Sequence, residues 1–157
     1  MTATVRAAVA AMLLLACARS AAADGALASD VAGRWATPGV SAIVELSPCA
    51  AERATLCGTI RWLWEAVDDR GRPRLDSRNM DATLRSRPLL GLAILSGLKP
   101  RQAVGWEGRI YNPEDGQSYR ATVSRRGADT LVVEGCVLFG CQKQVWWKAS
   151  VLAEALR

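Results

Sequence analysis

Short segments of alternating apolar and polar residues recur along the chain between turn-forming residues, together with one run, 89–95, that is apolar throughout. Successive side chains of an extended strand point to opposite faces, so this period of two predicts β-strands rather than helices. The clearest segment is 58–65, where Ile60, Trp62 and Trp64 alternate with mainly polar residues and are expected to share one face. The predicted strands cover residues 33–37, 41–47, 58–65, 89–95, 106–111, 118–124, 130–136 and 142–147.

The spacing of these segments predicts an all-β fold, a small antiparallel meander of about eight strands. Eight strands can close into an up-and-down barrel, which removes exposed sheet edges. Residues 112–117 (NPEDGQ) predict a hairpin turn, because Pro presets φ, Asn and Asp bond the local backbone, and Gly accepts positive φ. Segment 89–95 is apolar on both faces and predicts a buried strand or a short buried helix, with Gly91 favouring the strand. The tail, 148–157, is expected to form a short helix.

The N-terminus predicts a secretory signal peptide over residues 1–23. Arg6 supplies a positive start, residues 7–18 are twelve apolar residues, and three alanines at 21–23 offer a cleavage site. Twelve apolar residues are too few to span a bilayer, so no transmembrane segment is expected in the mature chain. The mature protein, 24–157, is predicted to be a single domain, because one core serves a chain of this length.

Two variants of this processing are open. Cleavage after Ala28 is a second possibility, and the residues before Cys17 resemble a lipoprotein signal, which would anchor the chain by a lipid. The large Leu15 and the shortened apolar stretch argue against lipidation. We therefore expect a periplasmic or secreted protein.

Composition excludes several classes of function. The chain has 20 basic and 15 acidic residues, and two of the basic ones lie in the predicted signal peptide. The mature charge is thus close to neutral, and nucleic acid is not an expected partner. The chain has no histidine. This removes the histidine-based catalytic triads and dyads, histidine acid–base catalysis and the commonest metal ligand. No cofactor is expected.

Four cysteines outside the signal peptide predict two disulfides, as befits an exported chain. Four cysteines permit three pairings, and short separations favour Cys49 with Cys57 and Cys136 with Cys141. A four-cysteine zinc site is the alternative, but it would need closely spaced Cys-x2-Cys pairs that are lacking here. We predict no metal site.

Several sequence blocks recur in the order typical of one bacterial family. They are G-x-W-x-T-P at 33–38, L-C-G-x-I-x-W-L at 56–63, D-x-x-N at 76–79, L-R-S-R-P-L-x-G at 84–91, W-x-G-x-I-Y-x-P-x-D-G-x-x-Y at 106–119, and Gly135 with Trp146. Over about 33–148 the chain resembles the exported bacterial proteins catalogued as domain of unknown function 2147. The resemblance implies a lipocalin-like envelope protein with no established activity. Members generally end in Trp-x-Arg, whereas this chain has Trp146 and Lys148, so a forked arginine contact is lost here.

Gly33 and Trp35 also resemble the opening of lipocalins, in which a Trp closes the narrow end of the barrel beneath a basic residue. Lys148 would supply that cation here. The plainer interpretation is that Trp35 fills the core, as buried aromatic residues usually do. On either interpretation Gly33, Trp35, Trp146 and Lys148 are predicted to be structural.

The tryptophans are also candidates for lining a ligand cavity, with filling of the core as the alternative. We select Trp62, Trp64 and Trp106 as candidate ligand-binding residues. The expected ligand is a small apolar or amphipathic molecule, and the protein is expected to be a monomer.

The long connection 66–87 is rich in Arg and Asp. Arg85 and Arg87 are candidates for gripping a carboxylate or phosphate, against the alternative that Asp–Arg pairs order the loop. The oxygen ligands of Asp76, Asn79 and Asp81 suggest calcium, but their spacing is unlike that of a calcium loop, and six nearby arginines would repel the ion.

The leading hypothesis is a non-enzymatic binding module. The alternative is an envelope interaction or structural module that uses the Arg/Asp-rich loop. A carboxylate-based hydrolase is the third hypothesis. Such an enzyme would need two acids paired in a cleft. The acids considered for it are Glu45, Glu65, Glu107, Glu114 and Asp115.

Overall fold

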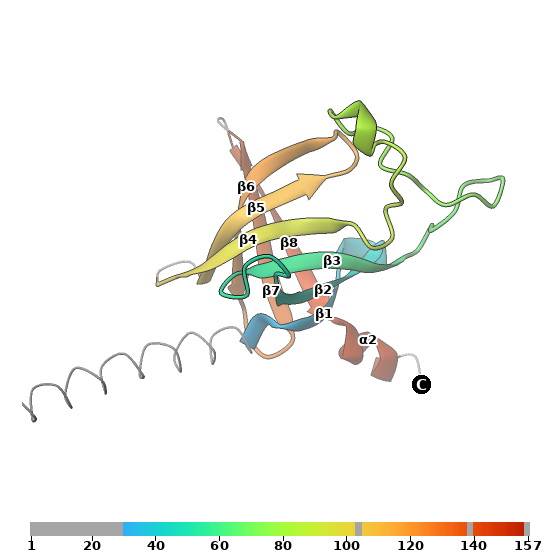
Figure 1. Cartoon of the computed structure of the whole chain (residues 1–157). Coiled ribbons are helices and arrows are strands. Elements are labelled where there is room, and N and C mark those ends of the chain that lie inside the picture. The colour runs from blue at the N-terminus through green and yellow to red at the C-terminus, as the bar shows by residue number, and fades with distance from the viewer. Residues whose placement is uncertain (1–29, 103–104, 138–139, 156–157) are drawn as a thin grey trace, which may run out of the picture. The chain divides into compact units, whose positions relative to one another are not determined.

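Eight antiparallel strands form a closed barrel within the described residues, which are 30–102, 105–137 and 140–155 of the computed structural model (Figure 1). Each strand pairs with its neighbours in the sequence, and β8 pairs with β1 to close the barrel. The predicted all-β barrel is confirmed. The predicted signal peptide lies outside the described residues. The strands are β1 (Gly33–Ala36), β2 (Ala42–Pro48), β3 (Leu56–Leu63), β4 (Ala93–Arg101), β5 (Gly105–Asn112), β6 (Gln117–Arg125), β7 (Thr130–Val137) and β8 (Gly140–Lys148).

Short helical elements lie outside the barrel wall. The 3₁₀ turn η1 (Pro38–Val40) joins β1 to β2, and η2 (Ala82–Leu84) lies in the long connection between β3 and β4. The helix α2 (Ala149–Ala155) follows β8 directly, within the tail where a short helix was expected. In the described part of the chain, none of the helices has the length and apolar character needed to cross a membrane.

One half of the barrel interior is packed solid. Trp35 is only 1% exposed, and its indole Nε1 donates a 2.9 Å hydrogen bond to the carbonyl of Val31. Alternation brings inward-pointing residues of β1 to β7 into this core. Its other members include Val44, Leu46, Leu56, Leu95, Leu98, Trp106, Val123 and Leu131. Trp35 lies opposite Lys148 in the short β1–β8 pair.

A β-bulge overturns the expectation that three residues of β3 share one face. Val44 pairs with Ile60 and the adjacent Ile43 pairs with Trp62, so Arg61 is an extra residue in β3. Ile60 is buried, whereas Trp62 is 39% exposed and Trp64, beyond the strand end, is 70% exposed. The extra residue reverses the alternation, which the sequence pattern alone could not show.

The apolar segment 89–95 is also only partly a strand. Leu89 and Leu90 belong to a turn, Gly91 has a φ of +87°, and β4 begins at Ala93. The amide of Gly91 donates to the carbonyl of Ile60, so the turn is already attached to β3. An apolar run therefore crosses the boundary between turn and strand, and hydrophobicity does not mark where the strand begins.

Both predicted local disulfides are confirmed in the described residues. Cys49 joins Cys57 across the β2–β3 connection, with 5.0 Å between their Cα atoms. Cys136 and Cys141 are directly opposite each other in the β7–β8 pair. Glu134 lies within ligand distance of the second pair, but cysteines joined in a disulfide offer no thiolate to a metal.

Candidate functional site

The other half of the barrel interior is an open pocket of about 1170 Å³. Its mouth is formed by the β1–β2, β3–β4 and β5–β6 connections and by the facing ends of β7 and β8. The floor is apolar, because it is formed by inward-pointing strand residues that lie next to the packed half. These floor residues include Ala42, Ile60, Ile94, Ile110, Val133 and Trp146.

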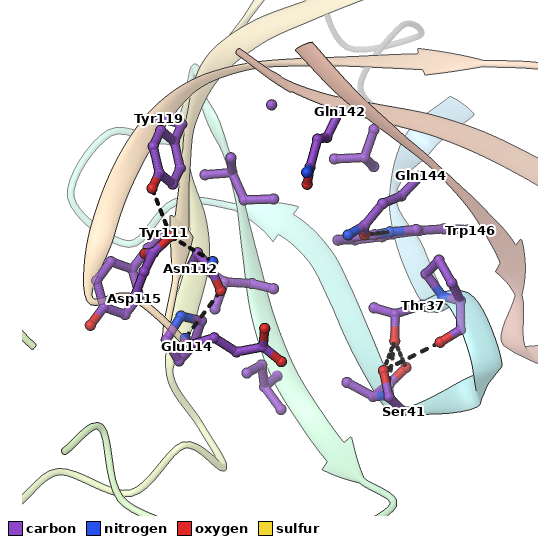
Figure 2. Close-up of a pocket in the computed structure, with 18 of the residues that line it drawn as sticks. Thr37, Ser41, Tyr111, Asn112, Glu114, Asp115, Tyr119, Gln142, Gln144 and Trp146 are labelled. Carbon is purple, nitrogen blue, oxygen red and sulfur yellow. Dashed lines mark hydrogen bonds between the residues drawn. The ribbon is translucent and has the colours of Figure 1, made fainter. Parts of the chain in front are cut away.

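One wall of the pocket carries a tyrosine–carboxylate pair from the β5–β6 hairpin. The Tyr119 hydroxyl donates to Asp115 Oδ2 over 2.6 Å, and Asn112 Nδ2 donates to the same oxygen over 2.9 Å (Figure 2). The amide of Gln117 donates to Asp115 Oδ1. Burial alone would raise the pKa of Asp115, but these donors outweigh it and lower the pKa. The bond to Asp115, with some burial, raises the pKa of Tyr119.

The facing wall comes from β8, where three alternate residues point into the pocket. Figure 2 shows Gln142, Gln144 and Trp146 along this strand. Trp146 is buried at the floor, and its Nε1 donates a 2.9 Å hydrogen bond to Gln144 Oε1. The wall thus passes from an apolar floor to amide groups near the mouth.

The connection between β1 and β2 forms a third part of the wall. Thr37 Oγ1 lies 2.9 Å from Ser41 Oγ and accepts a hydrogen bond from the amide of Ala42. These bonds close the turn around η1, so both hydroxyls are engaged in holding the backbone.

The rim carries exposed apolar side chains and one ion pair. Trp64 and Val137 are both largely exposed at the mouth. Arg74 forms an ion pair with Glu65, and its carbonyl accepts from the amide of Leu89. The two charges of the pair compensate each other at the rim.

A buried carboxylate attaches the long β3–β4 connection to β5. Asp76 is fully buried and accepts from the Tyr111 hydroxyl over 2.5 Å, from Asn79 Nδ2 over 2.8 Å and from Arg87 Nε over 2.8 Å. The guanidinium of Arg87 also lies over the Tyr111 ring, 5.6 Å from its centroid. Burial would raise the pKa of Asp76, but its three donors outweigh burial and lower it. Burial and the bond to Asp76 raise the pKa of Tyr111.

The two arginines selected as an anion grip are thus engaged within the connection. Arg87 pairs with Asp76, and Arg85 Nε donates to the carbonyl of Asn79 over 2.8 Å. Neither side chain lines the pocket. The arrangement is the Asp–Arg pairing that the sequence offered as the alternative. Asp81, one of the three candidate calcium ligands, accepts hydrogen bonds from Thr83 at the start of η2.

The three tryptophans proposed as ligand-binding residues occupy different places. Trp64 lies at the rim of the pocket, while Trp106 is buried in the packed half. Trp62 is not among the lining residues and packs edge-to-face against Trp64, with ring centroids 6.1 Å apart. Trp146, predicted to be structural, is buried and also forms part of the pocket floor.

Sequence reasoning missed most of the polar wall. The signal was present in β8, where Gln142, Gln144 and Trp146 share one face by alternation. Tyr119 and Asp115 were noted in the hairpin block, but a turn explained Asp115 without a pocket.

Comparison with solved structures finds a similar barrel in protein HP1028 from Helicobacter pylori, which is described as belonging to the lipocalin family. The two structures align with a TM-score of 0.64 and 16% sequence identity, over 79% of this chain and 87% of that one. At this identity the likeness concerns the fold. No curated protein matches the chain. Residues 33–148 match the family described as "Uncharacterized protein conserved in bacteria (DUF2147)", and the chain belongs to that family.

Proposed function

We propose that this protein is a non-enzymatic binding module that holds one small amphipathic ligand in the mouth of its barrel. The observation that carries the proposal is the division of the pocket into an apolar floor and a polar wall. The pocket, with its open mouth included, has a volume of about 1170 Å³, which accommodates a small organic molecule. The apolar part of a ligand would contact Ile60, Val133 and Trp146, and its polar end would face the hairpin and β8.

The environment of Asp115 supports binding rather than hydrolysis. A carboxylate hydrolase needs one acid with a raised pKa to donate a proton. Asp115 has the opposite property, because three donors hold its carboxylate ionised. Histidine, the usual substitute for such an acid, does not occur in the chain.

The proposed location is the bacterial periplasm or the exterior of the cell. Two disulfides in a member of a bacterial family favour an oxidising compartment. The predicted signal peptide, 1–23, provides the route of export. Because one chain builds the whole pocket, the proposed functional unit is a monomer.

Titration with the neutral apolar probe N-phenyl-1-naphthylamine tests the proposal. Gln142 is exposed and lines the pocket, so Gln142→Trp should fill space while it keeps the bond from Trp146 to Gln144, and it should weaken probe binding by about tenfold or more. The matched control is Val145→Trp, which adds an indole to the outer face of the same strand. An unchanged affinity in Gln142→Trp, or no probe binding by the parent protein, would refute the proposal.

A second candidate function rests on the surface of the long connection. Met80 is 73% exposed and Leu84 is also exposed, and Arg78 and Arg85 lie beside them in the sequence. Apolar and basic side chains together suit contact with an anionic envelope component. Co-sedimentation with phosphatidylglycerol vesicles, compared with phosphatidylcholine vesicles, tests this candidate. Met80→Asp should abolish any preference for the anionic vesicles, and equal binding of both kinds by the parent would refute it.

A further inference from the structure

The hydrogen-bond donors of the pocket wall are largely engaged within the protein. Tyr119 donates to Asp115, Trp146 donates to Gln144, and Asn112 donates to Asp115. The hydroxyls of Thr37 and Ser41 bond each other and the nearby backbone. A ligand that presents only acceptors therefore finds few free donors, chiefly the side-chain amides of Gln142 and Gln144.

A free carboxylate lies at the same wall. The backbone of Glu114 is held on both sides, because its amide donates to Asn112 Oδ1 and its carbonyl accepts from Arg78. Its side chain extends into the pocket (Figure 2). Among the described residues, no side chain donates a hydrogen bond to the Glu114 carboxylate or forms an ion pair with it.

The balance of charge around the pocket is negative. Four of the described lining residues carry a formal charge at neutral pH, and Arg74 and Glu65 compensate each other. Glu114 and Asp115 are left, and both lie in the hairpin turn on one side of the mouth. An anionic head group would meet two carboxylates there, whereas a cationic head group would complete the hydrogen bonds of Glu114.

From this donor and charge balance we propose that the pocket selects amphipathic ligands whose polar end is a protonated amine, and discriminates against carboxylates. This inference rests on the proposed function, since it assigns the class of ligand for the same pocket. The ammonium contacts Glu114, and the alkyl part lies on the apolar floor. The open mouth admits solvent, so the preference is moderate and weakens as salt is added.

Displacement of N-phenyl-1-naphthylamine by two ligands with the same alkyl chain tests the inference. Dodecylammonium and dodecanoate are compared at neutral pH and low salt, below the concentrations at which they form micelles. We expect dodecylammonium to bind about tenfold more tightly, and Glu114→Gln to reduce that preference to about threefold or less. Glu52→Gln is the matched control, because Glu52 lies in the β2–β3 connection at the packed end and its substitution removes the same charge.

The outcomes separate the two proposals. Equal or tighter binding of dodecanoate, with the neutral probe still bound, would overturn the inference and leave the proposed function standing. A preference that persists in Glu114→Gln would also overturn it, because the selectivity would then come from elsewhere. Absence of probe binding by the parent protein would overturn both. A preference lost in Glu114→Gln and kept in Glu52→Gln supports the inference.

Discussion

At the scale of single residues, Trp35 and Trp64 carry the same side chain in opposite environments. Trp35 is buried among residues of the packed half, and its indole N–H is satisfied by Val31. Trp64 stands at the rim of the pocket and is mostly in contact with solvent. Because stability follows the apolar surface removed from water, only the first should matter for folding.

We therefore predict that Trp35→Ala lowers the free energy of unfolding by about 3–5 kcal/mol, whereas Trp64→Ala lowers it by less than about 1 kcal/mol. Urea denaturation followed by circular dichroism measures both. Trp64→Ala should also weaken probe binding, since Trp64 lines the mouth. Losses of similar size in the two variants would show that the rim contributes to the core.

Asp76 is the residue whose ionisation should be visible in stability. Its pKa is lowered in the folded state, so the ionised form stabilises the fold above the unfolded-state pKa of about 4. That contribution is lost as the pH falls through the folded-state pKa. Asp76→Asn leaves Arg87 without its partner and should cost about 2–3 kcal/mol at neutral pH, with Arg87's partial exposure limiting the loss.

The measurement is a series of urea denaturations of the parent and of Asp76→Asn between neutral pH and about pH 2. The difference in unfolding free energy should shrink on acidification, because protonation removes the same charge from the parent. A difference that does not change with pH would contradict the assigned role of the carboxylate.

At the scale of elements, the β5–β6 hairpin supports the long β3–β4 connection through a glycine. Gly116 has a φ of +73°, and a Cβ atom there would lie 1.9 Å from the carbonyl oxygen of Arg78. The side chain of Arg78 also donates a hydrogen bond to the carbonyl of Glu114, which adds a second contact between the connection and the hairpin. The connection can approach the hairpin this closely only where no side chain intervenes.

Gly116→Ala should therefore destabilise the protein by about 2 kcal/mol or more, through backbone strain and displacement of the connection. Gly71→Ala is the matched control, because Gly71 has a φ of +72° and a Cβ atom there would meet open space. It should show the backbone strain alone, about 1 kcal/mol. Thermal denaturation of both variants checks the difference, and equal losses would argue against the contact with Arg78.

The limits of sequence analysis also lie at the level of elements. The hairpin around 112–117 was predictable, because its turn residues act locally. The bulge at Arg61 was not, because it depends on how β3 pairs with β2, and one extra residue moved Trp62 to the outer face. The start of β4 was misplaced for a related reason. Leu89 and Leu92 lie in the turn before β4, and their apolar side chains look the same in the sequence as those of a buried strand.

At the scale of the whole molecule, closure of the barrel followed from the number and spacing of the strands. The division of the interior into a packed half and a pocket did not follow, because it depends on the stagger of strands around the barrel. Trp106 and Trp146 both point inward, yet one lies in the packed core and the other forms the pocket floor. Spacing along the sequence does not distinguish these two layers.

The disulfides should add stability without being needed for folding. Each closes a short loop, so Cys49→Ser with Cys57→Ser, or Cys136→Ser with Cys141→Ser, should cost about 2–3 kcal/mol. The barrel core should keep both double variants folded, as judged by cooperative thermal denaturation. Loss of cooperative unfolding in either variant would contradict this expectation.

Removal of metal ions with EDTA should leave the melting temperature of the parent protein unchanged, because the sequence predicts no metal site. A lower melting temperature in EDTA that an added metal restores would contradict this prediction.

The pair that closes the barrel has a consequence for the order of folding. Trp35 with Lys148 and Ala36 with Trp147 are the two register pairs that join β1 to β8, whereas every other strand pairs with a neighbour in sequence. Neighbouring strands meet by closing loops of modest entropy, but β1 and β8 meet across nearly the whole domain. The curved sheet should thus assemble first and this narrow seam last, so that substitutions at Ala36 change the unfolding rate and leave the folding rate nearly unaltered.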